Sequence, residues 1–256
     1  MKYFIFAFAV ALIGEGCFAA APAPAVSTNL LKAVTATATP PVTWSGTVTM
    51  GLTVTQGNVD SVLTTGQITS ERKTHHDDLT LGADGAYGQV SGLQNVNSVH
   101  GSAQNNYTFI DDTWYGYARE DALHDAIADV EYRVTSSVGT GYYFIKSKMT
   151  TLSTEAGPSF RTEKLDDETH NYPAARVAES LAHKIDDHAK VWENIEFLPP
   201  LTFPDAFLIN AEVGVETPLT KKLSLQTYLQ DNYANVPAPG FKPNDLKLVS
   251  GLVMKF

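Results

Sequence analysis

The sequence predicts an all-β protein, a closed antiparallel transmembrane β-barrel of about 12 strands over residues 44–256. Three observations support this fold class. Apolar and polar residues alternate through most of the range, no stretch of ten or more residues has the period of an amphipathic helix, and the predicted connections alternate between short and long. Most segments also reach the roughly 9 to 11 residues that a tilted strand needs to cross a hydrocarbon core.

Each strand is predicted from period-two alternation. Residues 44–56, for example, place Trp44, Val48 and Leu52 on one face, with serine, threonine and glycine on the other. The predicted strands cover residues 44–56, 61–72, 78–88, 97–109, 113–120, 130–144, 150–161, 172–183, 188–198, 206–217, 222–233 and 245–256. The pattern leaves the registers of 113–120, 172–183 and 188–198 open, since Glu179 and Glu193 fall on otherwise apolar faces.

The connections between these strands sort by length. Short turns are predicted at 74–77, 110–112, 145–149, 184–187 and 218–221. Longer loops are predicted at 89–96, 121–129, 162–171, 199–205 and 234–244, and only the loop at 57–60 breaks the rule. Outer-membrane barrels have short periplasmic turns and long outer loops, so both ends of the barrel are expected on the periplasmic side.

The N-terminal residues 1–21 have the features of a secretory signal peptide. Lys2 precedes an apolar core at 3–14, and small residues suited to cleavage follow at 17–23. Residues 22–43 are rich in Ala, Pro and Thr and lack sustained periodicity, which is typical of a weakly ordered lead segment. The chain is therefore expected to be exported, and the barrel to occupy residues 44–256.

Composition excludes several classes of function. The 18 basic and 28 acidic residues give a net charge of −10, so no nucleic-acid partner is expected. The single Cys17 rules out a disulfide framework and a cysteine-based metal site. His75 and His76 precede two aspartates, but adjacent side chains on a turn diverge, and a solvated turn is the better interpretation. No metal and no cofactor are predicted.

In a membrane, the apolar face of the barrel meets lipid and the polar face lines the lumen. This assignment directs eight charged residues inward: Asp84, Glu131, Arg133, Glu155, Arg161, Arg176, Glu212 and Glu216. They could form the selectivity lining of a narrow, cation-favouring pore, or a structural ion-pair network that fills a small barrel. Two interfacial girdles are expected from aromatic residues near strand ends: Trp44, Tyr87, Phe109, Tyr132, Phe144, Phe160 and Phe207.

Three other classes of protein were considered. A soluble β-sandwich would bury these aromatic residues, but it would also bury Glu and Arg at prohibitive cost. An exported ligand-binding barrel would need an apolar interior, the reverse of the pattern. A hydrolase could use His100 and Ser102, but the alternation turns both toward the lumen, away from lipid substrate, and no enzyme is predicted. Acidic residues in the predicted outer loops, among them Asp121, could bind divalent cations, although simple solubility is the better explanation.

The final strand resembles that of bacterial outer-membrane barrels, which carries alternate apolar residues and a terminal phenylalanine. Leu246, Leu248, Leu252 and Phe256 match this pattern, and Met254 stands where an aromatic residue is usual. The resemblance implies recognition by the barrel assembly machinery.

Residues 44–256 resemble the family of salt-induced outer membrane proteins, a domain of unknown function. The most specific stretches are EAGPSFR (155–161) and ETPLTKKLSL (216–225). The resemblance implies a β-barrel surrounded by outer-membrane lipid and lipopolysaccharide, and it transfers no mechanism. The expected function is a narrow pore or an envelope component linked to salt or osmotic stress. The alternatives are a plugged structural or receptor-like barrel or, less in keeping with the residues, a hydrolase.

Overall fold

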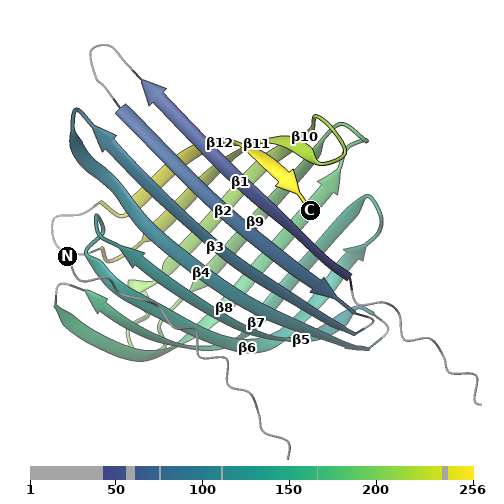
Figure 1. Ribbon diagram of the computed structural model, residues 1–256. Helices are drawn as coiled ribbons and strands as arrows, with labels where there is room; N and C mark the ends of the chain where they lie inside the picture. Colours follow the sequence, from purple (N-terminus) through teal and green to yellow (C-terminus); the bar gives the residue numbers. More distant parts are fainter. Residues whose placement is uncertain (1–42, 56–60, 75, 111, 166, 238–241) are drawn as a thin grey trace, which may run out of the picture. The chain divides into compact units, whose positions relative to one another are not determined.

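The computed structural model describes residues 43–55, 61–74, 76–110, 112–165, 167–237 and 242–256. The predicted signal peptide (1–21) and the lead segment up to residue 42 lie outside these residues. The described strands are β1 (Thr43–Thr55), β2 (Ser61–Lys73), β3 (Asp77–Val90), β4 (Leu93–Ile110), β5 (Trp114–Asp125), β6 (Val130–Lys146), β7 (Thr150–Leu165), β8 (Glu168–Lys184), β9 (Lys190–Leu198), β10 (Leu208–Pro218), β11 (Leu223–Ala234) and β12 (Asn244–Lys255). A single 3-10 turn, η1 (Pro204–Ala206), lies between β9 and β10 (Figure 1).

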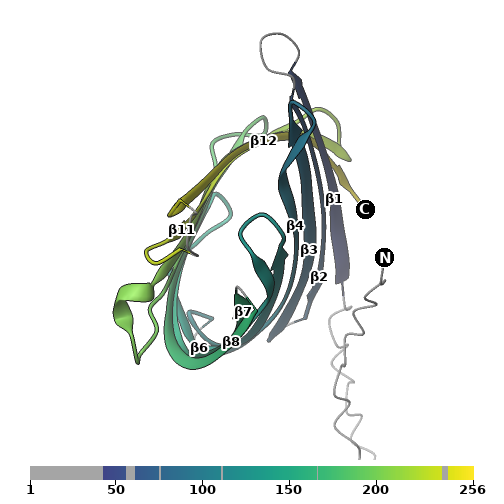
Figure 2. The ribbon, with the colours of Figure 1, turned by 90° about the vertical axis from the view of Figure 1, so that its left-hand side faces the viewer.

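The strands form one closed sheet. Each strand pairs antiparallel with the next in sequence, and β12 pairs with β1 to complete the barrel. Figure 2 looks into the barrel, with β1 to β4 on one side and β11 on the other. The predicted fold class, a closed antiparallel barrel of 12 strands, is confirmed. No helix among the described residues is long and apolar enough to cross a membrane.

Backbone register fixes which face each side chain occupies. Val48 pairs with Ile68, and both point outward; Ile68 is 48% exposed. The next pair, Thr49 and Gln67, points inward, and Thr49 is only 5% exposed. Because a slip of one residue would exchange the two faces, the alternation of apolar and polar residues specifies the register as well as the strands.

The three registers that the sequence left open are defined in the structure. Arg176 on β8 and Glu196 on β9 point inward, where they form an ion pair. Glu179 pairs with Ile195, and Leu181 pairs with Glu193, so both of these glutamates are on the outer face. β5 extends to Asp125, five residues beyond its predicted end, and brings Asp121 into the sheet.

The prediction of long loops at 89–96, 121–129 and 162–171 was wrong, because the strands continue into them. β3 and β4 are joined by Ser91 and Gly92 alone, with φ angles of 50° and 79°. Two consecutive residues of positive φ define the tight hairpin turn whose twist matches the flanking strands. β4, β6, β7 and β8 consequently reach 16 to 18 residues, whereas β9 to β12 have 9 to 12.

The barrel closes along a short seam between β1 and β12. Five residue pairs, from Thr47–Lys255 to Gly51–Gly251, define this seam, whereas 13 pairs join β1 to β2. Beyond the last pair, Gly46 and Phe256 exchange two backbone hydrogen bonds of 3.0 Å. The ring of Phe256 lies 2.4 Å from the position that a Cβ atom on residue 46 would take, so a larger residue there would have to displace the ring.

Candidate functional site

A continuous series of polar contacts crosses the lumenal face from β3 to β10. It begins with His100 on β4, whose Nδ1 lies 2.9 Å from Asp84 and whose Nε2 lies 3.3 Å from Asp121. A carboxylate accepts hydrogen bonds and cannot donate them, so an imidazole facing two carboxylates satisfies both only when both nitrogens carry protons. His100 therefore serves as a cationic bridge between β3 and β5.

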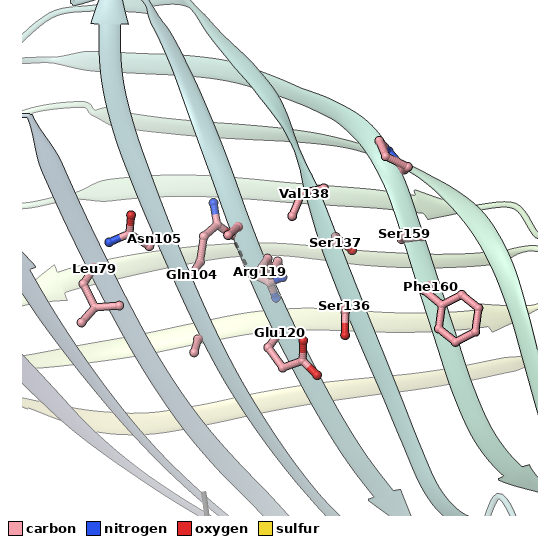
Figure 3. A pocket seen from close by; sticks show the side chains of 13 residues that line it. Leu79, Gln104, Asn105, Arg119, Glu120, Ser136, Ser137, Val138, Ser159 and Phe160 are labelled. Carbon is pink, nitrogen blue, oxygen red and sulfur yellow. Dashed lines mark hydrogen bonds between the residues drawn. The ribbon is translucent and has the colours of Figure 1, made fainter. Parts of the chain in front are cut away.

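Arg119 and Gln104 carry the series from β5 to β7. The Arg119 guanidinium donates two hydrogen bonds to Asp121, of 2.6 and 2.5 Å, and one of 3.0 Å to the Gln104 side-chain oxygen (Figure 3). The Gln104 amide nitrogen in turn donates to Glu155 over 2.8 Å. Two-pronged contact between guanidinium and carboxylate fixes geometry as well as charge, so Arg119 and Asp121 are held in one arrangement.

Arg176 completes the series across β7, β8 and β9. It donates to Glu155 over 2.6 Å and to Glu196 over 2.5 Å, and Asn210 on β10 donates to Glu196 over 3.0 Å. The Arg176 side chain is only 5% exposed. Removing a charge from water costs several kcal/mol, and two carboxylate partners offset that cost only with close geometry. We call this series of side chains the lumenal network. Its members are Asp84, His100, Gln104, Arg119, Asp121, Glu155, Arg176, Glu196 and Asn210.

Glycine residues make room for the aromatic side chains beside this network. Tyr115 and Tyr117 on β5 pair with Gly141 and Gly139 on β6, and each ring lies over its glycine. The Tyr115 hydroxyl donates to Glu155 over 2.9 Å, and the Arg176 guanidinium lies 5.0 Å from the centre of the Tyr117 ring. Both tyrosines are nearly inaccessible, at 2% and 4% exposure, so they pack against the wall and do not offer a stacking surface to solutes.

A second cluster lies toward the ends of β6, β7 and β8. Arg133 donates to Glu163 over 2.6 Å, and the Tyr172 hydroxyl donates to the other oxygen of the same carboxylate. Arg161, 1% exposed, donates to that hydroxyl over 3.4 Å. Phe203, from the β9–β10 connection, packs edge-on against Tyr172 with 4.7 Å between ring centres. The connection is thereby anchored to the barrel wall.

An acidic pair faces this wall from the opposite side of the lumen. Glu212 on β10 accepts a 2.9 Å hydrogen bond from the Trp192 indole, and it has no cationic partner among the described residues. Asp84 on β3 interacts electrostatically with both Glu212 and Tyr228 on β11, although β3 and β10 lie on different sides of the barrel. We call Glu212 and Asp84 the acidic pair; Asp84 is also bound to His100, so Glu212 is the member that lacks a cationic partner in the described part of the chain.

The predicted lumen-lining residues do not form one site. Asp84, Glu155 and Arg176 belong to the lumenal network, and Arg133 and Arg161 belong to the second cluster. Glu212 forms the acidic pair with Asp84, and Glu216 pairs with Lys255 near the periplasmic end. Glu131 lies apart from all of these. It sits at a β-bulge on β6, and its side chain is 57% exposed and pairs with Lys164.

The sequence-based prediction omitted most of the connecting residues. They are His100, Gln104, Tyr115, Tyr117, Arg119, Asp121, Glu163, Trp192 and Glu196. The sequence signal that could have found them was alternation along the strand. Gln104, Asp121 and Glu196 each lie an even number of residues from an inward-pointing side chain on the same strand. Asp121 was placed in an outer loop, and it instead lies within β5.

The predicted girdle residues lie on the outer face at both ends of the strands. Trp44 is near the start of β1, and Phe109 and Phe144 are near the ends of β4 and β6; their exposed fractions are 57%, 49% and 61%. Tyr87, Tyr132, Phe160 and Phe207 are nearer the opposite end. On β12, Leu252 and Met254 also point outward, opposite Leu225 and Leu223.

A closed antiparallel barrel with a charged, hydrogen-bonded lumen and an apolar outer face defines the class of outer-membrane porin-like β-barrels. Two solved structures share this fold. The COG4313 outer membrane channel from Pseudomonas putida F1 is 12% identical, with a TM-score of 0.51 over 85% of this chain and 96% of that one. The NanC porin is 8% identical, with a TM-score of 0.50 over 82% and 98% of the two chains. At these identities the likeness shows the fold alone.

The chain belongs to the family described as DUF481, a protein family of unknown function, whose match covers residues 48–256. No curated protein sequence matches it.

Proposed function

We propose that the chain forms a narrow, cation-favouring pore across the bacterial outer membrane. The observation that carries this proposal is Glu212, a lumenal carboxylate that has no cationic partner among the described residues and interacts electrostatically with Asp84, the other member of the acidic pair. Negative side chains at the narrow part of a pore attract cations and repel anions. Most other lumenal charges, Asp84 with its partner His100 among them, are paired in the lumenal network or in the second cluster, so they contribute less net field than Glu212.

A physiological role in salt or osmotic balance is part of the same proposal. Passage of small cations is the activity that an envelope component serving salt or osmotic balance would need. The support is the resemblance of EAGPSFR and ETPLTKKLSL to the salt-induced outer membrane proteins. Export by the N-terminal signal peptide, contact with lipopolysaccharide, and recognition of Leu252, Met254 and Phe256 by the barrel assembly machinery remain predictions that accompany it.

A catalytic role is not part of this proposal. A serine hydrolase needs a histidine nitrogen free to accept the proton of the serine hydroxyl. Both ring nitrogens of His100 face carboxylates, those of Asp84 and Asp121, and none is left for Ser102 on the same strand. The arrangement of His100 therefore supports a structural or electrostatic role.

Current through a planar bilayer carrying the refolded mature chain tests the pore. Insertion is verified separately by heat-dependent mobility on a gel. We expect discrete conductance steps and, in a salt gradient, a reversal potential of the sign for cation preference. Silence from protein that has demonstrably inserted would contradict the proposal and favour the plugged barrel.

The matched pair Glu212→Gln and Glu131→Gln locates the selectivity. Both changes remove one carboxylate, but Glu131 is exposed near the end of β6, whereas Glu212 lies on the lumenal face of β10. We expect Glu212→Gln to move the reversal potential toward zero and Glu131→Gln to leave it nearly unchanged. An equal shift for the two variants would mean that overall charge, and not the acidic pair, sets selectivity.

A further inference from the structure

The inward-pointing residues of β8 to β11 lie in rows that strand register defines. The row nearest the C-terminal end of β12 consists of Lys184, Lys190, Glu216 and Gln226. The next row consists of Ala182, Trp192, Gly214 and Tyr228, and the third of Ser180, Asn194, Glu212 and Gln230. Lys247 extends the third row onto β12, where its ammonium is paired with Asp245 over 2.8 Å. An uncharged row therefore separates a row with two lysines from the row that carries Glu212.

A pocket of about 300 Å³ lies at the end of the barrel that the first row borders. The charged residues that line it are Lys148, Lys184, Lys190, Lys255, Asp186, Asp187 and Glu216. Lysines therefore outnumber carboxylates in the pocket. We call this end of the barrel, which includes the turns β2–β3, β4–β5, β6–β7, β8–β9 and β10–β11, the lysine mouth.

Two lysines of the pocket are not neutralised by a direct partner. Lys184 is paired with Asp187 over 3.0 Å, and Lys255 is paired with Glu216. Lys148 and Lys190, by contrast, have no carboxylate within ion-pair distance among the described residues. Lys190 interacts electrostatically with Glu216, whose charge Lys255 already offsets. The pocket consequently keeps an excess of positive charge.

The two ends of the barrel differ in the sign of their unpaired charges. In the turns and strand ends of the lysine mouth, the described side chains that form no ion pair with a lysine, an arginine or a carboxylate are Lys146, Lys148, Lys190, Lys221, Lys222, Asp78, Asp112 and Asp186. At the opposite mouth, the corresponding side chains are Lys242, Asp125, Asp129, Glu168 and Asp205. Lysines are thus the majority at one mouth and carboxylates at the other, on the same side of the uncharged row as Glu212.

We propose that the pore rectifies, so that it carries more current at one sign of the voltage than at the other, because the lysine mouth opposes the acidic lumen beyond it. The inference rests on the proposed pore and specifies how ions pass through it. Cations concentrate beside carboxylates and anions beside lysines. When the opposite mouth is at the positive potential, cations enter past Glu212 and anions enter past Lys190, so both accumulate in the lumen and the conductance rises. The reverse voltage draws both kinds of ion out of the lumen, and the conductance falls.

The distance between the two charged rows sets the dependence on salt. Glu212 and Glu216 are four residues apart on β10, so their rows are separated by about 10 Å along the axis of a barrel whose strands tilt by roughly 40°. Mobile ions screen charges over about 3 Å at 1 M ionic strength and over about 30 Å at 0.01 M. The fields of the two rows therefore act together in dilute salt and are screened from each other in concentrated salt.

Single-channel currents of the refolded mature chain at equal and opposite voltages test the inference. The ratio of the two currents is taken for each channel, so it does not depend on the direction of insertion. We expect a ratio of about 2 or more with about 0.01 M KCl on both sides and a ratio near 1 in about 1 M KCl. A conducting channel with equal currents in dilute salt would overturn the inference and leave the pore intact. Silence from inserted protein would instead contradict the pore itself, and rectification would fall with it.

Two matched double variants assign the effect to the pocket. Lys148→Gln with Lys190→Gln removes the two unpaired lysines that line it, and we expect the current ratio in dilute salt to fall toward 1. Lys221→Gln with Lys222→Gln removes the same charge from the β10–β11 turn, outside the pocket lining, and should keep most of the wild-type ratio. Heat-dependent gel mobility verifies that both variants form the barrel. An unchanged ratio in the first variant, or an equal loss in the two, would overturn the inference.

Discussion

Two walls of the same barrel are stabilised in different ways. The wall of β4 to β8, the polar wall, carries Arg119, Glu155 and Arg176 on its lumenal face, where they are paired with one another or with neighbouring polar side chains. The wall of β10 to β12 and β1, the aliphatic wall, presents Val249 and Val253 to the lumen and large aliphatic groups to the outside. Both walls are antiparallel sheets, and their side chains differ in the kind of interaction that stabilises them.

The comparison shows where each wall is vulnerable. In the polar wall, buried charges satisfy one another, and losing one partner leaves another charge uncompensated. In the aliphatic wall, stability comes from backbone pairing and from apolar surface in contact with lipid, so it is sensitive to charge on the outer face. The two walls should therefore respond in opposite order to the same kinds of substitution.

The largest expected effect is loss of the central cation of the polar wall. Arg176→Met leaves Glu155 and Glu196 without their partner, and removal of one member of a buried ion pair costs about 3 to 5 kcal/mol. Reversible urea unfolding in lipid vesicles, followed by the fluorescence of the 3 tryptophans, measures it. The matched change Lys247→Met in the aliphatic wall breaks the 2.8 Å pair with the half-exposed Asp245 and should cost at most about 1 kcal/mol. Similar losses would remove the distinction between the walls.

The next effect concerns the outer faces. Val213→Arg puts a charge on the lipid side of the aliphatic wall and should lower the free energy of unfolding by about 2 to 4 kcal/mol. Ser136→Arg is also outward, but its register partner Glu120 can pair with the new guanidinium, so the loss should be smaller. In a Glu120→Gln background the two arginines should become equally costly. The same unfolding assay compares all four variants, and an unchanged cost at Ser136 in that background would contradict the explanation.

A third prediction tests the glycine contacts of the polar wall. A Cβ atom on residue 141 would lie 2.1 Å from the Tyr115 ring, so Gly141→Val must displace a buried tyrosine, at about 1 to 3 kcal/mol. Outside that wall, Gly66 on β2 has no atom within 4 Å of the same position, and Gly66→Val should change stability by about 0.5 kcal/mol or less. Parallel urea titrations of the two variants measure the change in the free energy of unfolding. If both variants match the wild type, the contact between Gly141 and Tyr115 has no energetic role.

The smallest effect is expected in the turn that joins β8 to β9, at the boundary of the polar wall. The Asp186 carboxylate accepts hydrogen bonds from the backbone N–H groups of His188 (2.7 Å) and Ala189 (2.9 Å). The His188 N–H is the main cause that holds the pKa of Asp186 below its ordinary 3.8. A lowered folded-state pKa stabilises the fold above 3.8, and this contribution is lost as the pH falls through the lowered value. Asp186→Ala should thus be slightly less stable at pH 7, with the difference vanishing in acid; a difference independent of pH would exclude this mechanism.

The fold could be predicted from the sequence because a membrane barrel imposes one rule on every strand. Lipid on one side and a wet lumen on the other require alternation at period two, and Trp44 to Leu52 shows it without exception. The rule becomes weak where charges occur on both faces. In β5, Glu120 points outward and Asp121 inward, so the upper half of that strand lacks an apolar face and resembles a loop in sequence.

The site could be predicted only in part, because parity assigns a face and does not assign a partner. Arg176 reaches Glu155 on one neighbouring strand and Glu196 on the other, and these pairings depend on strand register. Glu131 shows the second limit. A β-bulge adds one residue to β6, so alternation counted along the chain no longer indicates the direction of its side chain.

The short seam has a mechanical consequence. A β-barrel is a sheet that closes by pairing its first strand with its last. Its resistance to mechanical opening is limited by the weakest of its strand pairings. Five residue pairs hold β1 to β12, fewer than join any other neighbouring strands in the described barrel. The Phe256 ring packs over Gly46 at the end of this strand pairing. A lateral force on the wall would part β1 from β12 first, and the cylinder would unroll from that line into an open sheet.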